Sequence, residues 1–177
     1  MVLDKARRLG LSWRNSSNGW NHRANGYLRR ANLKVDSARM NDLKKAKEFA
    51  INSIKRSPSN SYAWSRLMLA NYRLEGRTED VRRALMASIN MANYLPRLFY
   101  IRAKFGMRIW PLLSQLDRKV VFQQIRMGFK VDKKQIISLT GHPVDLGIIR
   151  AAMSIDLKSI IAFEDSYEFY VTRHLKK

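Results

Sequence analysis

The 177-residue chain contains no cysteine. Disulfide bonds, thiolate-bound zinc, iron–sulfur clusters and cysteine nucleophiles are therefore excluded. No apolar run approaches the roughly 20 residues that a membrane-spanning helix needs. The first 20 residues carry Lys5, Arg7, Arg8 and Arg14 with no apolar stretch after them, so we expect neither a secretory signal nor a membrane anchor.

Acidic residues are scarce. The chain has 34 Lys and Arg against 14 Asp and Glu, a net charge of +20. The excess is uneven, since residues 1–60 carry 14 basic and 4 acidic residues, residues 61–130 carry 13 and 4, and residues 131–177 carry 7 and 6. A positive electrostatic field attracts nucleic acid, anionic lipid, acidic proteins or anionic glycans. The alternative interpretation is that the basic surface only keeps the protein soluble.

Patterns typical of catalysis are missing as well. The sequence has no GxSxG motif, no glycine-rich phosphate-binding loop and no pair of carboxylates in an apolar setting. Its three histidines, His22, His142 and His174, are far apart, and none has the four-residue spacing of a helical metal pair. We therefore expect no enzymatic activity, no catalytic residue, no metal, no cofactor and no small-molecule substrate.

A hydrophobic content of 46%, with 10% aromatic residues, is enough to bury a core, and the length fits one domain with or without an appendage. No window shows the period-two alternation of a strand, so the sequence predicts an all-α fold. Apolar residues at spacings of three and four predict helices over residues 20–31, 43–54, 63–74, 81–92, 96–109, 116–129, 136–139, 144–153 and 157–171.

Four residues are expected to cap helix N-termini: Thr78, Ser114, Asp132 and Asp156. Ser114 has Asp117 three residues later, which is the spacing of a capping box. These caps mark short connections between consecutive helices.

A repeat-like pattern spans the second and third predicted helices. The small residues Ala46, Ala50 and Ser53 precede Pro58. Trp64 and Leu67 then fall where a 34-residue helix–turn–helix unit places the large side chains that fill the groove left by those small ones. Over about residues 20–93 this pattern resembles a tetratricopeptide repeat (TPR).

The resemblance implies antiparallel helix pairs stacked as a short right-handed α-solenoid with a C-terminal capping helix. It divides the chain into a basic N-terminal arm (1–16), TPR-like helical repeats (17–130), and short helices with the capping helix (131–177). Arg30 and Lys34 depart from the pattern, since they replace a large and a small residue of the first unit. That unit is then interpreted as a capping repeat with a polar outer face.

TPR proteins most often bind peptides or partner proteins in a concave groove. By this resemblance, the groove-facing, partner-binding positions here are Tyr62, Arg66, Leu69 and Arg73. The Lys/Asn/Arg clamp that some members use for a C-terminal carboxylate is not recognisable. Because guanidinium groups bind carboxylates in a bidentate manner, the expected partner is an acidic or extended protein segment. The alternative is an ordinary solvated helix face.

A narrower similarity begins at Tyr94. It is carried by Leu95-Pro96-Arg97-Leu98, Met107-Arg108-Ile109-Trp110-Pro111, Asp117-Arg118 and Gln124-x-Arg126. These residues are similar to the tail of small bacterial TPR-like proteins associated with exopolysaccharide or O-antigen assembly. The resemblance implies an accessory or scaffold role. Trp64 and Trp110 are expected in the core.

Two other functions stay open. The basic charge of residues 1–130 also fits a helical protein that binds nucleic acid or the ribosome, although no RNA- or DNA-reading motif is present. A peripheral adaptor at an anionic membrane is the third function, based on the arm Lys5-x-Arg7-Arg8-Leu9-x-Leu11-x-Trp13-Arg14. We expect a cytoplasmic protein, associated with membranes through a partner if at all.

Overall fold

The computed structural model describes residues 15–175, with side chains as far as Thr172. Every regular element in this range is helical, which confirms the predicted all-α class. Within it, no helix combines the length and apolar character needed to cross a bilayer. The expected basic arm, residues 1–16, lies almost wholly outside the described residues.

Residue contacts divide the chain into two units, Met1–Ala92 and Asn93–Lys177. The sequence predicts one array of helical repeats over residues 17–130, and the boundary between the two units falls within that range. The first unit contains α2 (Ser17–Arg30), η1 (Ala31–Leu33), α3 (Asp36–Arg56), α4 (Ser61–Glu75) and α5 (Glu79–Met91). The second contains α6 (Pro96–Arg108), η2 (Trp110–Leu112), α7 (Gln115–Val131), α8 (Lys133–Ile137), α9 (Pro143–Met153) and α10 (Leu157–Leu175).

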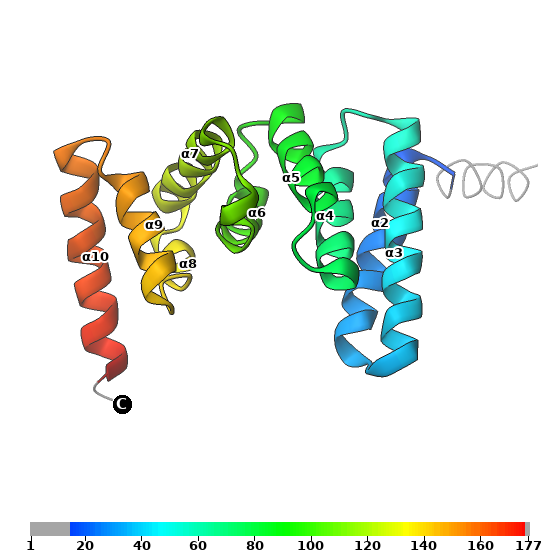
Figure 1. Ribbon diagram of the computed structural model, residues 1–177, viewed down its shortest axis with the longest axis horizontal. Helices are drawn as coiled ribbons and strands as arrows, with labels where there is room; N and C mark the ends of the chain where they lie inside the picture. Colours follow the sequence, from blue (N-terminus) through cyan, green and yellow to red (C-terminus); the bar gives the residue numbers. More distant parts are fainter. Residues whose placement is uncertain (1–14, 176–177) are drawn as a thin grey trace, which may run out of the picture. The chain divides into compact units, whose positions relative to one another are not determined.

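In the first unit, each helix packs on the next one in sequence, and α2 also packs on α4 (Figure 1). The contacts are made largely by small side chains, which let the helix backbones approach closely. Ala46, Ala50 and Ser53 of α3 are fully buried, as are Ala63 and Ala70 of α4. The small residues that carry the repeat-like pattern are therefore helix contacts.

Short polar side chains tie these helices together. The Ser53 hydroxyl donates to the Ser17 carbonyl at 2.8 Å, and the Asn60 amide donates to the Ser17 hydroxyl at 3.0 Å. Ser61 and Ser88 exchange a reciprocal pair, each hydroxyl donating to the other residue's carbonyl, at 2.7 and 3.0 Å. Because such bonds require one alignment of the two helices, they fix the packing register.

The predicted caps are confirmed at three of the four positions. Ser114 and Asp117 form a complete capping box at the start of α7. Asp132 accepts from the backbone N–H of Gln135, and Asp156 from that of Ser159. Thr78 stands at the N-cap position of α5, but its hydroxyl makes no capping bond and is buried without a partner among the described residues.

The second unit has a core of larger apolar side chains. Phe163 of α10 is fully buried, with its ring centroid 5.8 Å from that of Phe129 on α7. Gly106 lets α6 approach α7, because a Cβ at that position would lie 2.6 Å from Val121 Cγ1. The predicted stripe of α10 is only partly buried, since Leu157 and Ile161 remain exposed.

The expectation that Trp64 and Trp110 lie in the core is wrong in degree, because both are half-buried. Trp64 stands in the first turn of α4 and donates its indole N–H to the Pro58 carbonyl at 2.7 Å, which keeps one edge of the ring at the surface. Trp110 packs on Phe122 at a centroid distance of 5.3 Å. Leu67 is half-buried, whereas Pro58 and Pro111 are exposed.

Candidate functional site

The two arginines expected in the groove lie on α4 and reach across to α2. Arg66 donates from Nη1 to Asn21 Oδ1 at 2.8 Å and to the Tyr62 carbonyl at 3.1 Å. Arg73 donates from Nη1 to the Leu28 carbonyl at 3.1 Å. The structure therefore brings both guanidinium groups to the surface shared by α2 and α4, two turns apart.

Tyr62 and Leu69, the other two expected groove residues, differ in their surroundings. Tyr62 is half-buried, and Arg66 Cζ lies 5.7 Å from the centre of its ring. Leu69 packs against the buried cluster that includes Leu28 of α2 and Ala46 of α3. Tyr62 thus lies beside the arginine, whereas Leu69 contributes mainly to the helix packing beneath.

Arg66 is the electrostatically unusual residue of this group. Burial lowers the pKa of its guanidinium below the ordinary value, and the nearby Arg29 cation lowers it further, while Tyr62 acts in the opposite direction. Its Nε is buried and has no acceptor among the described residues. No described carboxylate pairs with it either. The site therefore holds a partly desolvated positive charge without a counter-ion, which is unfavourable in isolation.

A second charged cluster on the same unit is neutralised internally. Asp42 of α3 is buried, and its Oδ2 accepts from Arg30 Nε at 2.7 Å and lies 3.1 Å from Lys34 Nζ. These partners, the Arg30 hydrogen bond first, lower the pKa of Asp42 from 3.8 to about 2. The two residues that depart from the repeat pattern are thus the counter-ions of a buried carboxylate.

A row of stacked aromatic and cationic side chains lies along α2 and α3. Phe49 stacks between Trp20 and Tyr27, with centroid distances of 5.3 and 5.1 Å. Arg23 covers Trp20 at 4.7 Å and Arg30 covers Tyr27 at 4.4 Å. Sequence reasoning missed this row, although the seven-residue spacing of Trp20 and Tyr27, each followed by an arginine three residues later, could have indicated it.

Sequence reasoning also missed Asn21 as a partner of Arg66. The useful clue is a shared spacing: Asn21 and Leu28 are seven residues apart, as are Arg66 and Arg73. Both cross-helix bonds join residues 45 positions apart in the sequence. Two bonds with one common offset require that α2 and α4 run parallel.

The remaining candidate residues serve local structure. His142 is the N-cap of α9 and accepts from the backbone N–H of Val144 at 3.2 Å. In the part of the chain that the structure describes, no three metal-ligating side chains come together. No protein-family model matches the chain, and no curated protein or solved structure matches it either. Function is therefore inferred from the contacts above.

Proposed function

We propose that this chain is a non-catalytic, TPR-like scaffold or adaptor that binds an acidic, extended segment of a partner protein along α2 and α4. The observation that carries the proposal is the uncompensated guanidinium of Arg66 beside Arg29. A carboxylate on the partner would supply the missing counter-charge, and charge-assisted hydrogen bonds of this kind are about twice as strong as neutral ones.

The packing order within the first unit supports a repeat arrangement. Consecutive helices pack on one another, and α2 also contacts α4, as the first helices of neighbouring units do in an α-solenoid. The common offset of 45 residues supports parallel alignment of these two helices. This offset exceeds the 34 residues of a TPR unit, and the 21-residue length of α3 accounts for much of the difference.

The spacing of the two arginines suggests how the ligand lies. Seven helical residues span about 10.5 Å at a rise of about 1.5 Å per residue. In an extended polyproline II segment, which has three residues per turn and rises about 3.1 Å per residue, side chains three residues apart lie on one side and about 9 Å from each other. The preferred segment therefore carries two carboxylates roughly three residues apart. The resemblance of residues 95–126 to accessory proteins of polysaccharide assembly supports the proposal that such a partner belongs to that kind of machinery.

The test is the affinity of the full chain for a fluorescent 12-residue peptide with glutamates at every third position. Arg66→Gln should weaken binding roughly tenfold or more, because a satisfied charge-assisted contact contributes about 1.5–3 kcal/mol. Arg39→Gln, on the exposed start of α3, is the matched control and should change the affinity less than twofold.

Thermal unfolding of the same variants separates binding from structure. If Arg66→Gln lowers the Tm and leaves the peptide affinity unchanged, Arg66 is only a tie between α4 and α2, and the proposal fails. Equal, small losses of affinity at Arg66, Arg29 and Arg39 would instead favour a diffuse polyanion surface.

Binding of nucleic acid is a second candidate, favoured by the aromatic and cationic row on α2 and α3. Its ring faces are covered by one another and by Arg23 and Arg30, so this row would contact phosphates rather than intercalate bases. A single-stranded oligonucleotide should then bind with a steep salt dependence, and each lost cation should reduce the slope by about one.

A further inference from the structure

The connection between α2 and α3 exposes a cluster of apolar side chains. Among the residues that the structure describes in the first unit, four large apolar side chains are exposed: Leu33 (86%), Val35 (73%), Met40 (41%) and Met91 (45%). The first three lie within eight residues of one another, in the segment that ends α2, forms η1 and begins α3. Residues 29–45 are here named the α2–α3 corner. Apolar side chains gathered on one surface indicate an interaction site, whereas singly scattered ones do not.

The α2–α3 corner projects beyond the other helices of its unit (Figure 1). Lys47 Nζ lies 2.7 Å from Glu75 Oε1, which places the last residue of α4 beside the middle of the 21-residue α3. Because α3 and α4 run antiparallel through a short connection, about the first two turns of α3 extend past the end of α4. Leu33 and Val35 thus lie at the tip of a helical hairpin.

An ion pair holds the corner in a shape that turns its apolar side chains outward. Lys34 has extended backbone angles, φ −126° and ψ 160°, and its Nζ lies 3.1 Å from Oδ2 of the buried Asp42. With Lys34 directed toward Asp42, its neighbours Leu33 and Val35 point away, since successive side chains alternate along an extended backbone. Asp36 then enters α3 with φ +54°, a left-handed conformation that is unfavourable for a residue other than glycine. The tip is therefore fixed by its surroundings, with its apolar residues in solvent.

The α2–α3 corner is also strongly basic. Its charged residues are six cations against two carboxylates, a net charge of +4: Arg29, Arg30, Lys34, Arg39, Lys44 and Lys45 with Asp36 and Asp42. Arg39 and Lys44 are exposed and form no ion pair with any described residue. Behind the corner, residues 73–83, which join α4 to α5, carry four basic and three acidic residues and do not cancel this charge. An anionic surface is therefore attracted to the same corner that presents the apolar side chains.

We propose that the α2–α3 corner docks on an anionic membrane surface, with Leu33 and Val35 inserted at the boundary between headgroups and lipid chains and with Arg39 and Lys44 on the headgroup phosphates. Shallow apolar insertion combined with attraction to anionic lipid binds peripheral proteins to a bilayer without spanning it. Stable attachment takes two such contributions together, and the corner supplies both.

Other occupants fit the α2–α3 corner less well. A nucleic acid would be attracted by the cations, but Leu33 and Val35, the most exposed of the first unit's described apolar side chains, offer its phosphates no hydrogen bond. A second copy of the chain, meeting corner to corner, would bring two net charges of +4 together.

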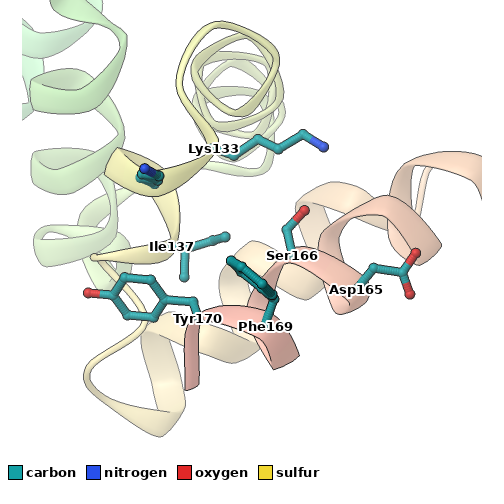
Figure 2. Close-up of a pocket in the computed structure, with 7 residues that line it drawn as sticks. Lys133, Ile137, Asp165, Ser166, Phe169 and Tyr170 are labelled. Atoms are coloured by element: carbon teal, nitrogen blue, oxygen red, sulfur yellow. The ribbon is translucent and has the colours of Figure 1, made fainter. Parts of the chain in front are cut away.

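The second unit also combines apolar and basic side chains, but in a hollow instead of a projection. The hollow, of about 520 Å³, lies between α8 and α10 (Figure 2), where Ile137, Phe169 and Tyr170 line it together with Lys133, Lys134 and Asp165. Side chains in a hollow are less accessible to a flat bilayer than those at a projecting tip. Phe169, although 59% exposed, is therefore a suitable control for Leu33 and Val35.

The test is the partition of the full chain between buffer and sedimented vesicles, made of phosphatidylcholine alone or mixed with phosphatidylglycerol, at physiological salt. Binding should require the anionic lipid. Leu33→Ser combined with Val35→Ser should lower the partition coefficient roughly tenfold or more, because two apolar side chains no longer leave water. Arg39→Gln combined with Lys44→Gln should lower it by a similar factor, since each cation near an anionic surface strengthens binding about fivefold.

Matched variants remove the same kinds of side chain elsewhere. Met91→Ser with Phe169→Ser removes two exposed apolar side chains, and Lys55→Gln with Arg56→Gln removes two exposed cations at the opposite end of α3. The partition coefficient should change less than about twofold, since the two cations lie more than a Debye length from the corner. The apolar double variant of the corner should keep the affinity of the unmodified chain for the glutamate peptide, so failure here is distinguishable from failure of the function proposed above.

A fluorescent label reports the orientation directly, because the chain has no cysteine of its own. Ser37→Cys and Ser59→Cys each place one environment-sensitive NBD group at an exposed position, the first in the α2–α3 corner and the second just beyond the other end of α3. On addition of anionic vesicles, the emission of the label at residue 37 should shift to the blue, whereas that of the label at residue 59 should stay unchanged.

Three results would overturn the inference. Equal vesicle binding by the apolar double variant and the unmodified chain would leave only a diffuse attraction between cations and lipid. A blue shift at residue 59 instead of residue 37 would assign the membrane contact to another surface. Absence of vesicle binding, together with binding of a single-stranded oligonucleotide that Arg39→Gln and Lys44→Gln weaken, would assign the α2–α3 corner to nucleic acid.

Discussion

The cores of the two units consist of different kinds of side chain. Among the residues that the structure describes, nine polar or charged residues are buried; seven of them belong to the first unit, and the exceptions are Arg102 and Gln124. Conversely, seven of the eleven largest fully buried apolar side chains in the described range belong to the second unit. The first unit is thus held by small side chains and directional hydrogen bonds, and the second by the burial of large apolar groups.

The difference in core composition affects which kind of binding surface each unit can present. Directional bonds between helices hold the α2 and α4 side chains in one alignment, so the first unit can present guanidinium groups at defined positions. The second unit relies on apolar burial, and on α10 that apolar character continues to the outer surface. We therefore expect the charge-selective site on the first unit.

The largest effect is expected from the second unit's core. Phe163→Ala empties a fully buried site beside Phe129 and should lower the free energy of unfolding by about 3–5 kcal/mol, measured by urea denaturation. Phe169→Ala removes an exposed ring from the same helix and should change it by less than about 0.5 kcal/mol. Similar losses from both variants would contradict the assignment of α10's buried face.

Substitutions that add volume to the core should destabilise the first unit, because its helices pack closely through small side chains. Ala50→Leu adds volume where α3 contacts its neighbours without space, and should destabilise the chain by about 1–3 kcal/mol. Ala38→Leu, on the exposed first turns of the same helix, should be nearly neutral. If Ala50→Leu were tolerated equally well, close packing through small residues would not hold this unit together.

A smaller loss is expected from Gly106→Ala. The new methyl group would lie 2.6 Å from Val121 Cγ1, and relieving this clash costs about 1–3 kcal/mol, against a gain in helix propensity of up to about 1 kcal/mol. Gly26→Ala on α2 meets no atom within 4 Å and should stabilise by about 0.5–1 kcal/mol. If both variants change the Tm in the same direction, the contact between α6 and α7 is looser than described.

The ion pairs of Asp42 should appear in the pH dependence of stability. Because the pKa of Asp42 is lowered from 3.8 to about 2, its contribution is complete above about pH 4 and is lost as the pH falls toward 2. Tm values measured between pH 5 and pH 2.5 should therefore fall less steeply for Asp42→Asn than for the unmodified chain. Identical slopes would mean that other carboxylates carry the effect.

Much of the fold was predictable because its cues are local. Helix periodicity, the prolines and the capping pairs act within a few residues, and the small residues Ala46, Ala50 and Ser53 mark the buried face of α3 directly. The burial of the two tryptophans is overestimated from the sequence. Hydrophobicity alone does not reveal that the Trp64 indole N–H donates to the Pro58 carbonyl.

The candidate site was predictable only in part. The arginines of α4 could be placed on one helix face by their seven-residue spacing, but their partners Asn21 and Leu28 lie 45 residues away and depend on tertiary packing. The roles of Arg30 and Lys34 were hidden for the same reason, since only the folded chain brings Asp42 between them.

The most direct test of the central claim is the side-chain Nε–Hε NMR resonance of Arg66, assigned by its loss in Arg66→Lys. On titration with the glutamate peptide, the charge-selective site predicts a saturable shift of this resonance, with little change at Arg39. A peptide that binds while the Arg66 resonance stays in place, or that shifts all arginine resonances alike, would contradict a defined anion site on α2 and α4.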